Sequence, residues 1–202
     1  MKKFVYLAIL TSLLLVGCQD KIKEPEAEMK ESDSSEFQEQ EVHAEMKELE
    51  VELINTDGVG VGLATLKEKG DGVHIEVDAH HLEPGLHGFH IHERGLCEAP
   101  TFESAGGHFN PTNKKHGFDN PEGPHAGDIV NIEVKEDGTV KANFVNDMVT
   151  LKEGVANSLL GKEGSSLMIH ADPDDYVSQP AGNAGDRIVC GVISAPESDR
   201  KK

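Results

Sequence analysis

Six histidines and one aspartate are the residues in this chain best able to do chemistry. They are His90, His92, His108, His116, His125, Asp128 and His170. Imidazole is the commonest protein ligand for zinc and copper, and a carboxylate adds an oxygen ligand. Seven ligands are more than one tetrahedral ion needs, but they suit two adjacent ions that share one ligand. The pattern therefore predicts a centre for two metal ions.

The spacing of these residues supports the same interpretation. His90 and His92 are two residues apart on a predicted strand, 86–92, so both rings share one face and reach one metal. Such a pair alone is a weak signal, and solvated surface histidines are the alternative. Here, however, three more histidines follow at intervals of eight and nine residues along a glycine-rich loop, and Asp128 comes three residues after the last. Confinement to strand ends and one loop favours metal ligands.

The elements that must position these ligands are predicted to be β-strands. Apolar residues alternate with polar ones in four segments, which places the apolar side chains on one face of each strand: 47–55, 72–79, 128–134 and 139–145. Shorter strands are predicted at 86–92, 167–169 and 188–189. Many short antiparallel strands indicate an all-β sandwich or barrel.

Turn residues and long loops complete this prediction. Asp-Gly pairs or a Gly-Asp-Gly triplet separate strand-like runs at 57–58, 70–72 and 137–138, and the last is the strongest prediction of a hairpin. Two long segments, 93–127 and 171–187, break the strand pattern. Loops of this length in a compact domain are usually functional or disordered, and their Gly, Pro, His and Asp content favours a structured site.

The first residues indicate export. Lys2 and Lys3 precede a short apolar run, Phe4 to Val16, which is too short to span a bilayer. The run ends in Leu-Val-Gly-Cys18, which resembles a bacterial lipoprotein signal. That resemblance implies removal of residues 1–17 and a lipid on Cys18. An ordinary secretory signal is the alternative, and either one places the protein outside the cytoplasm. With the lipid, the protein is expected to be anchored to a bacterial membrane on its extracytoplasmic face.

An acidic segment separates Cys18 from the domain expected at 47–202. Residues 19–46 contain ten Asp or Glu against three Lys and few large apolar residues, so a flexible tether is expected, with a solvated helix as the alternative. The whole chain has 19 Lys and Arg against 37 Asp and Glu, a net charge of −18. Nucleic-acid binding requires a basic surface, so no nucleic-acid partner is expected.

Six strings in this order resemble the copper/zinc superoxide dismutase family: GLHGFHIHERG, SAGGHFNP, KHG, GPHAGD, MIHADPDD and GNAGDRIVCGVI. The resemblance covers roughly residues 48–195. It implies an eight-stranded Greek-key antiparallel β-barrel or sandwich with two long functional loops, since enzymes of this family share the sandwich architecture. It also implies a copper ion and a zinc ion as cofactors and superoxide as the substrate. The family reaction converts superoxide to oxygen and hydrogen peroxide in two steps.

The resemblance assigns roles to individual residues. Copper is held by His90, His92, His108 and His170. Zinc is held by His108, His116, His125 and Asp128, so that His108 bridges both ions and is catalytic. Arg187 attracts and orients the superoxide anion, and Asp174 links a copper-ligand histidine to a zinc-ligand histidine, with Asp175 as its rival. Cys97 and Cys190 match family positions that form a disulfide.

One departure from the family concerns charge. Many members carry lysines near copper in the loop that here spans 171–186, but this loop contains no Lys or Arg and four Asp. A slower catalyst is expected unless Lys114, Lys115 or Arg94 supplies a positive field. The alternatives to an enzyme are a non-catalytic lipoprotein that buffers or delivers metal and a structural protein with zinc alone. A homodimer is possible, since family members differ in oligomeric state.

Overall fold

A computed structural model describes residues 47–200 of the chain. The predicted signal, Cys18 and the acidic tether lie outside the described residues. The eight described strands are β1 Glu48–Asn55, β2 Gly60–Lys69, β3 Gly72–Ala79, β4 Gly85–His92, β5 Asp128–Val134, β6 Val140–Asn146, β7 Ser165–His170 and β8 Arg187–Ser194. Two short helices, η1 Glu103–Ala105 and α1 Glu197–Arg200, complete the described elements.

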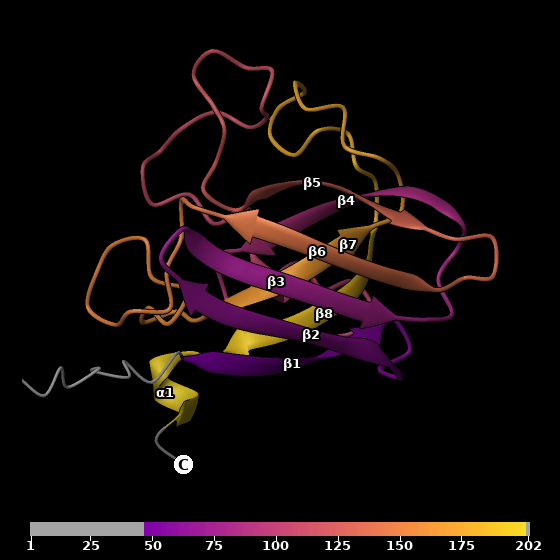
Figure 1. The fold of residues 1–202 in the computed structure, drawn as a ribbon, viewed down its shortest axis with the longest axis horizontal. Helices are drawn as coiled ribbons and strands as arrows, with labels where there is room; N and C mark the ends of the chain where they lie inside the picture. Colours follow the sequence, from indigo (N-terminus) through magenta and orange to yellow (C-terminus); the bar gives the residue numbers. More distant parts are fainter. Residues whose placement is uncertain (1–46, 201–202) are drawn as a thin grey trace, which may run out of the picture. The chain divides into compact units, whose positions relative to one another are not determined.

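All eight strands form one antiparallel sheet in the order β5-β4-β7-β8-β1-β2-β3-β6. The sheet curls until its two edge strands, β5 and β6, contact each other, which gives a nearly closed barrel (Figure 1). The expected all-β Greek-key architecture is therefore confirmed. No helix within residues 47–200 has the length and apolar character needed to cross a membrane.

The alternation of apolar residues builds the core. In β3, Val73, Ile75 and Val77 are buried, whereas the residues between them are half-buried or exposed. Full burial of one such side chain contributes about 1.5–3 kcal/mol relative to leaving it in water. Around the site the pattern differs, because every residue from His87 to His92 in β4 is buried. This strand lies between β5 and β7, and its histidines belong to the interior.

One predicted hairpin is wrong. The turn at 137–138 forms, with Lys135 N–H donating to Thr139 O at 2.9 Å, but β5 and β6 do not continue as a paired ladder. Each strand pairs with another partner, β5 with β4 and β6 with β3. A groove lined by Ile129, Val130 and residues 143–148 lies at the seam between β5 and β6. Turn residues determine the local backbone conformation, but they do not determine which strands pair with the two strands that the turn connects.

Several boundaries differ from those predicted. The strand-like run between the first two turns forms β2, and β8 extends well beyond residues 188–189. A third long connection, residues 147–164, joins β6 to β7, and the carboxylate of Glu68 holds it by accepting from Leu151 N–H at 2.6 Å. The connections at 93–127 and 171–186 are the two that reach the candidate site.

Candidate metal centre

The structure brings the seven predicted ligands into two groups that share one residue. The four-histidine group consists of His90, His92, His108 and His170. The mixed group consists of His108, His116, His125 and Asp128. Within each group, the candidate ligand atoms all lie within 4.8 Å of one another, and all seven residues are buried.

The sheet positions the four-histidine group. His90 and His92 lie on β4, and His170 ends β7, the strand that pairs with β4. His108 is on the long connection after β4, but an isolated antiparallel bridge between His92 and His108 fixes it beside that strand. Three of the four rings thus stand on paired strands, and the fourth is tied to them through the backbone.

Each ring in the four-histidine group has one bonded nitrogen and one free nitrogen. His92 Nδ1 donates to Gly106 O at 3.0 Å, and His170 Nδ1 donates to Gly185 O at 3.2 Å. His90 Nε2 donates to Asp174 Oδ2 at 2.8 Å. The other nitrogens are buried without a hydrogen-bond partner: His90 Nδ1, His92 Nε2, His108 Nε2 and His170 Nε2. Metal-ligating histidines show this division, in which a hydrogen bond orients the ring and the opposite nitrogen faces the metal.

The mixed group has the dimensions of a tetrahedral zinc cage. Asp128 Oδ1 lies 2.8 Å from His108 Nδ1, 3.1 Å from His116 Nδ1 and 3.3 Å from His125 Nδ1. The Nδ1 atoms of His108 and His125 are 3.5 Å apart. Ligand atoms at tetrahedral zinc, with bonds of ~2.0–2.1 Å, stand about 3.3–3.4 Å from one another. His116 Nδ1 makes no hydrogen bond despite its short distance to Asp128, as expected of an atom directed at a shared centre.

The His108 ring faces both groups at once. Its Nδ1 lies beside Asp128 in the mixed group, and its Nε2 is one of the four free nitrogens of the other group. His87 provides a contrast from the same strand as His90. Its two ring nitrogens face the carbonyl oxygens of His170 and Glu83, both at 2.8 Å, so it has no free nitrogen to offer a metal. His87 therefore has a structural role within the barrel.

Electrostatics prepares the four-histidine group to bind a cation. Burial lowers the pKa of His90 and of His92, lowers the pKa of His170 to about 3, and lowers that of His108 to about 4. These four rings are therefore neutral near pH 7, with lone pairs available. Burial acts against the charged form of each imidazole because the low-dielectric interior cannot solvate it.

The mixed group carries the compensating charges. Burial alone lowers the pKa of His116, but the carboxylates of Asp128 and Asp174 outweigh it and raise the pKa to about 9. Burial alone raises the pKa of Asp128, but the hydrogen bond with His108 and the close imidazoles of His116 and His125 hold it well below its usual range. Without a metal, a proton on His116 therefore balances the buried carboxylates. A divalent cation in the mixed group takes over that role.

Asp174 links the two groups. Its Oδ2 accepts from His90 Nε2 at 2.8 Å, and its Oδ1 accepts from His116 Nε2 at 3.0 Å. The carboxylate is buried, whereas the rival Asp175 is exposed and caps its own loop by accepting from the N–H groups of Val177 and Ser178. The geometry thus assigns the linking role to Asp174 and a loop-capping role to Asp175.

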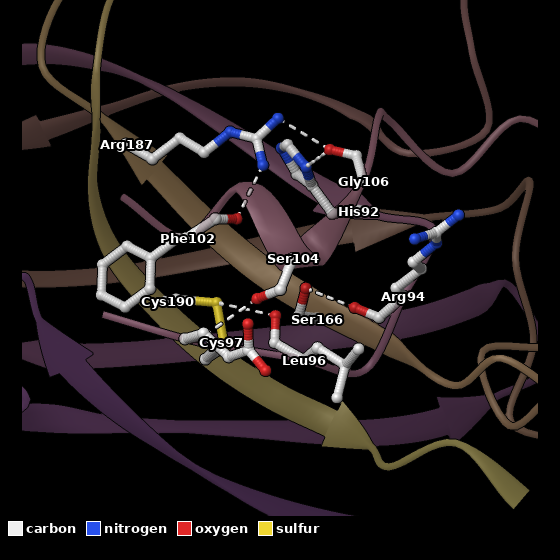
Figure 2. The surroundings of a disulfide bond; sticks show 11 residues. His92, Arg94, Leu96, Cys97, Phe102, Ser104, Gly106, Ser166, Arg187 and Cys190 are labelled. Carbon is white, nitrogen blue, oxygen red and sulfur yellow. Dashed lines mark hydrogen bonds between the residues drawn. A yellow bond between two sulfur atoms is a disulfide. The ribbon is translucent and has the colours of Figure 1, made fainter. Parts of the chain in front are cut away.

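Arg187 lies at the edge of the four-histidine group, at the start of β8. Its guanidinium donates to Phe102 O and to Gly106 O, both at 2.7 Å (Figure 2). Gly106 O is also the acceptor for His92, so one carbonyl fixes the cation and a candidate ligand together. Burial lowers the pKa of Arg187, while Glu103 raises it. The guanidinium stays charged because an arginine titrates far above neutral pH.

A disulfide between Cys97 and Cys190 attaches the loop that carries these carbonyls to β8 (Figure 2). Phe102, Ala105 and Met168 pack around Cys190 in a small apolar cluster separate from the barrel core. Sequence reasoning did not find the carbonyls of Phe102 and Gly106, because a backbone oxygen has no side-chain signature. It also did not find Asn131 or Gln179, whose amides hold the site from outside.

A family model for copper/zinc superoxide dismutase matches residues 61–193. The chain belongs to the copper/zinc superoxide dismutase family. It is 57% identical over 143 residues to superoxide dismutase [Cu-Zn] 2 of Aquifex aeolicus, covering 70% of this chain and 84% of that protein. It is 42% identical over 196 residues to superoxide dismutase-like protein YojM of Bacillus subtilis, covering 96% of each. This is a family of oxidoreductases that use copper and zinc.

Solved structures of the same family share the fold. A superoxide dismutase-like protein from Bacillus subtilis matches with a TM-score of 0.71 at 47% identity, covering 73% of this chain and 99% of that one. The copper/zinc superoxide dismutase from Brucella abortus matches with a TM-score of 0.60 at 32% identity, covering 73% and 99%. The donor atoms described above fit both family metals, since four imidazoles suit copper and three imidazoles with one carboxylate suit zinc.

Proposed function

We propose that this protein dismutates superoxide, with copper in the four-histidine group and zinc in the mixed group. The observation that carries the proposal is the His108 ring, whose two nitrogens face the two groups, beside a guanidinium fixed on the same loop. A site that only stored metal would not need a cation at its edge. Copper supplies the alternation between two oxidation states, and zinc supplies a fixed charge that orients the shared ring.

The residues of the chain have separate tasks in this reaction. Arg187 attracts the superoxide anion and holds it beside the free nitrogens of the four-histidine group. His108 Nε2 is the atom that holds a proton for the peroxide product, because it is the ring nitrogen that faces the reacting side. Asp174 keeps the rings of His90 and His116 from rotating, through one hydrogen bond to each. Burial of the histidines and of Asp174 keeps bulk water from competing for the ligand atoms.

We further propose that the electrostatic field of the protein attracts superoxide to the site only weakly. Loop 171–186 has no basic residue, and Glu103 and Asp186 line a pocket together with Arg187. Lys114, Lys115 and Arg94 are exposed and lie on the other long loop. Negative charge beside the anion-binding guanidinium reduces the local potential that raises association rates. A rate below that of well-steered family members follows, with a shallow dependence on ionic strength.

The second candidate function is non-catalytic metal binding, which the Bacillus relative favours. That relative is named superoxide dismutase-like, and two solved structures of the Bacillus protein are variants with introduced histidines. The present chain has six buried histidines in its two groups without any substitution. The complete set and Arg187 together support catalysis over storage.

The deciding experiment is superoxide removal by the protein loaded with copper and zinc. His92→Ala removes one free nitrogen and is expected to abolish metal-dependent activity. Arg187→Ala is expected to lower kcat/KM by about 10- to 100-fold and to leave copper bound. His80→Ala, an exposed histidine outside both groups, is the matched control. Loaded wild-type protein without activity would leave metal storage as the function.

For location, we propose a lipid anchor on Cys18 and an extracytoplasmic site of action, on the basis of the signal-like sequence. Fractionation of cells that express the wild-type chain or Cys18→Ser tests this, since the variant should leave the membrane fraction. Metabolic labelling with a fatty acid distinguishes a lipid from another form of attachment. Monomer and homodimer are the two alternatives for the oligomeric state, and the mass of the purified domain in solution distinguishes them.

A further inference from the structure

Two carboxamide side chains hold the backbone of the residues that form the His116–Asp174 link. Gln179 Oε1 accepts from His116 N–H at 3.0 Å, and Gln179 Nε2 donates to His116 O at 2.9 Å. Asn131 Oδ1 accepts from Asp174 N–H at 2.8 Å, and Asn131 Nδ2 donates to Asp174 O at 2.9 Å. Each amide therefore satisfies both polar groups of one residue's main chain.

These pairs occur where the sheet cannot provide support. His116 and Asp174 lie on the two long connections, outside the strands, so no ladder pairs their N–H and C=O groups. A side-chain amide carries a donor and an acceptor, as a peptide group does, and can replace a neighbouring strand. Gln179 also donates to Val177 O in its own loop, and Asn131 belongs to β5. We call each amide with its two backbone hydrogen bonds a clamp. The Gln179 clamp joins the two long loops, and the Asn131 clamp joins a loop to the barrel.

The two clamps act on different parts of the centre. The Gln179 clamp fixes His116, whose Nδ1 belongs to the mixed group alone. The Asn131 clamp fixes Asp174, whose two oxygens bond His116 and His90 and so reach both groups. Gly182 closes the remaining side, because a Cβ there would stand only 1.8 Å from Asp174 Oδ1. The carboxylate has no free space on that side, and the Asn131 clamp fixes the backbone from which it extends.

We propose that Gln179 is a positioning residue for zinc retention and that Asn131 is a positioning residue for retention of both metals. This inference rests on the proposed function, because it takes the mixed group as the zinc site and the four-histidine group as the copper site. Gln179 is exposed, and Asn131 is half-buried; neither touches a metal position. Gln179 acts through hydrogen bonds to the backbone of His116, a candidate zinc ligand. Asn131 acts through hydrogen bonds to the backbone of Asp174, which links His116 to His90.

The test is the release of each metal from the loaded protein into an excess of a coloured chelator. Gln179→Met keeps the length of the side chain and removes its hydrogen bonds to His116. It should speed zinc release about 30-fold, as two hydrogen bonds of ordinary net strength imply, and leave copper release unchanged. Asn131→Leu should speed the release of both metals. Val177→Ala, an exposed apolar position in the same loop, is the matched control and should change neither rate.

A second readout separates positioning from general destabilisation. Cobalt(II) in place of zinc reports ligand geometry through its visible absorption, which should change in Gln179→Met and stay constant in Val177→Ala. Should Asn131→Leu fail to fold, Asn131→Asp keeps the acceptor for Asp174 N–H, loses the donor to Asp174 O and adds one negative charge. Zinc release from Gln179→Met at the wild-type rate would overturn the inference and leave the proposed function standing. Wild-type protein that takes up no zinc would overturn both.

Discussion

Removal of the Cys97–Cys190 disulfide should destabilise the protein strongly and loosen its anion-binding side chain. The two cysteines are 93 residues apart in sequence, and the bond closes that part of the chain into a loop. The chain-entropy relation for a loop of 93 residues gives about 4.6 kcal/mol at 25 °C. Since domains of this size have a total stability of about 5–15 kcal/mol, the loss is a large fraction of the whole.

The assay is urea unfolding of the metal-free double variant Cys97→Ser/Cys190→Ser beside the oxidised wild type. Metal-free protein is needed because bound ions stabilise the folded state independently. With an m-value of about 2 kcal/mol per molar, the midpoint should fall by about 2 M urea. Reduced wild-type protein should unfold with the variant, which controls for the serine substitutions. A midpoint within about 0.5 M of the oxidised wild type would refute the reasoning. It would show that closing this loop in the unfolded chain contributes little to the stability.

The same variant has a predicted functional effect. The loop that the disulfide anchors supplies both carbonyl acceptors of Arg187, from Phe102 and Gly106. Freed from β8, these acceptors move, and the guanidinium loses its fixed position. Superoxide removal by the metal-loaded folded variant, measured per bound copper ion, should therefore show a lower kcat/KM. Equal kcat/KM in both proteins would mean that Arg187 is positioned without the loop.

Three further predictions concern the metal groups and their charges. Gly182→Ala, at a φ of +65°, places a Cβ against Asp174 Oδ1 and should weaken zinc and copper binding by about 10- to 100-fold in chelator competition. Glu103→Gln should raise kcat/KM about twofold at low salt, and the gain should vanish at high salt, because Glu103 lies in the field of Arg187. Zinc binding should release about one proton between about pH 6.5 and 9, because His116, with its pKa raised to about 9, is protonated there without metal. Zinc affinity should accordingly rise about tenfold per pH unit up to about pH 9 and then level off, as calorimetry in buffers of different ionisation enthalpy would show.

The sequence predicted strands well where burial alternates and poorly where closure is decided by distant partners. The alternation in β3 gave its full extent, because every second residue faces one core. The Asp-Gly pair at 137–138 correctly predicted a turn but wrongly predicted a hairpin, because β5 and β6 form their ladders with β4 and β3. Turn residues report the local backbone only, and the pairing of eight strands is a property of the whole barrel.

The ligands were accessible from sequence for a different reason. Their residue types are chemically distinctive, and His90 and His92 share a face by simple strand geometry. The groups that position them have no such mark. Gln179 is one exposed glutamine, and its two bonds to His116 depend on two loops that meet only in the folded chain. Chemistry can be read from side-chain type, whereas support requires the three-dimensional path of the backbone.

The Gly106 carbonyl shows how support and chemistry are joined. It accepts from His92 Nδ1 at 3.0 Å and from Arg187 at 2.7 Å, so a candidate ligand and the anion-binding cation are both held to one atom. Phe102 supplies the other acceptor from a left-handed conformation, with φ of 54°, which costs a non-glycine residue about 1–2 kcal/mol. Its ring is fully buried, which contributes about 1.5–3 kcal/mol and offsets that cost. The burial of the ring therefore keeps Phe102 in the strained conformation that presents its carbonyl to Arg187. The barrel strands therefore place both residues, His92 at the end of β4 and Arg187 at the start of β8, and the loop orients their side chains through the Gly106 carbonyl.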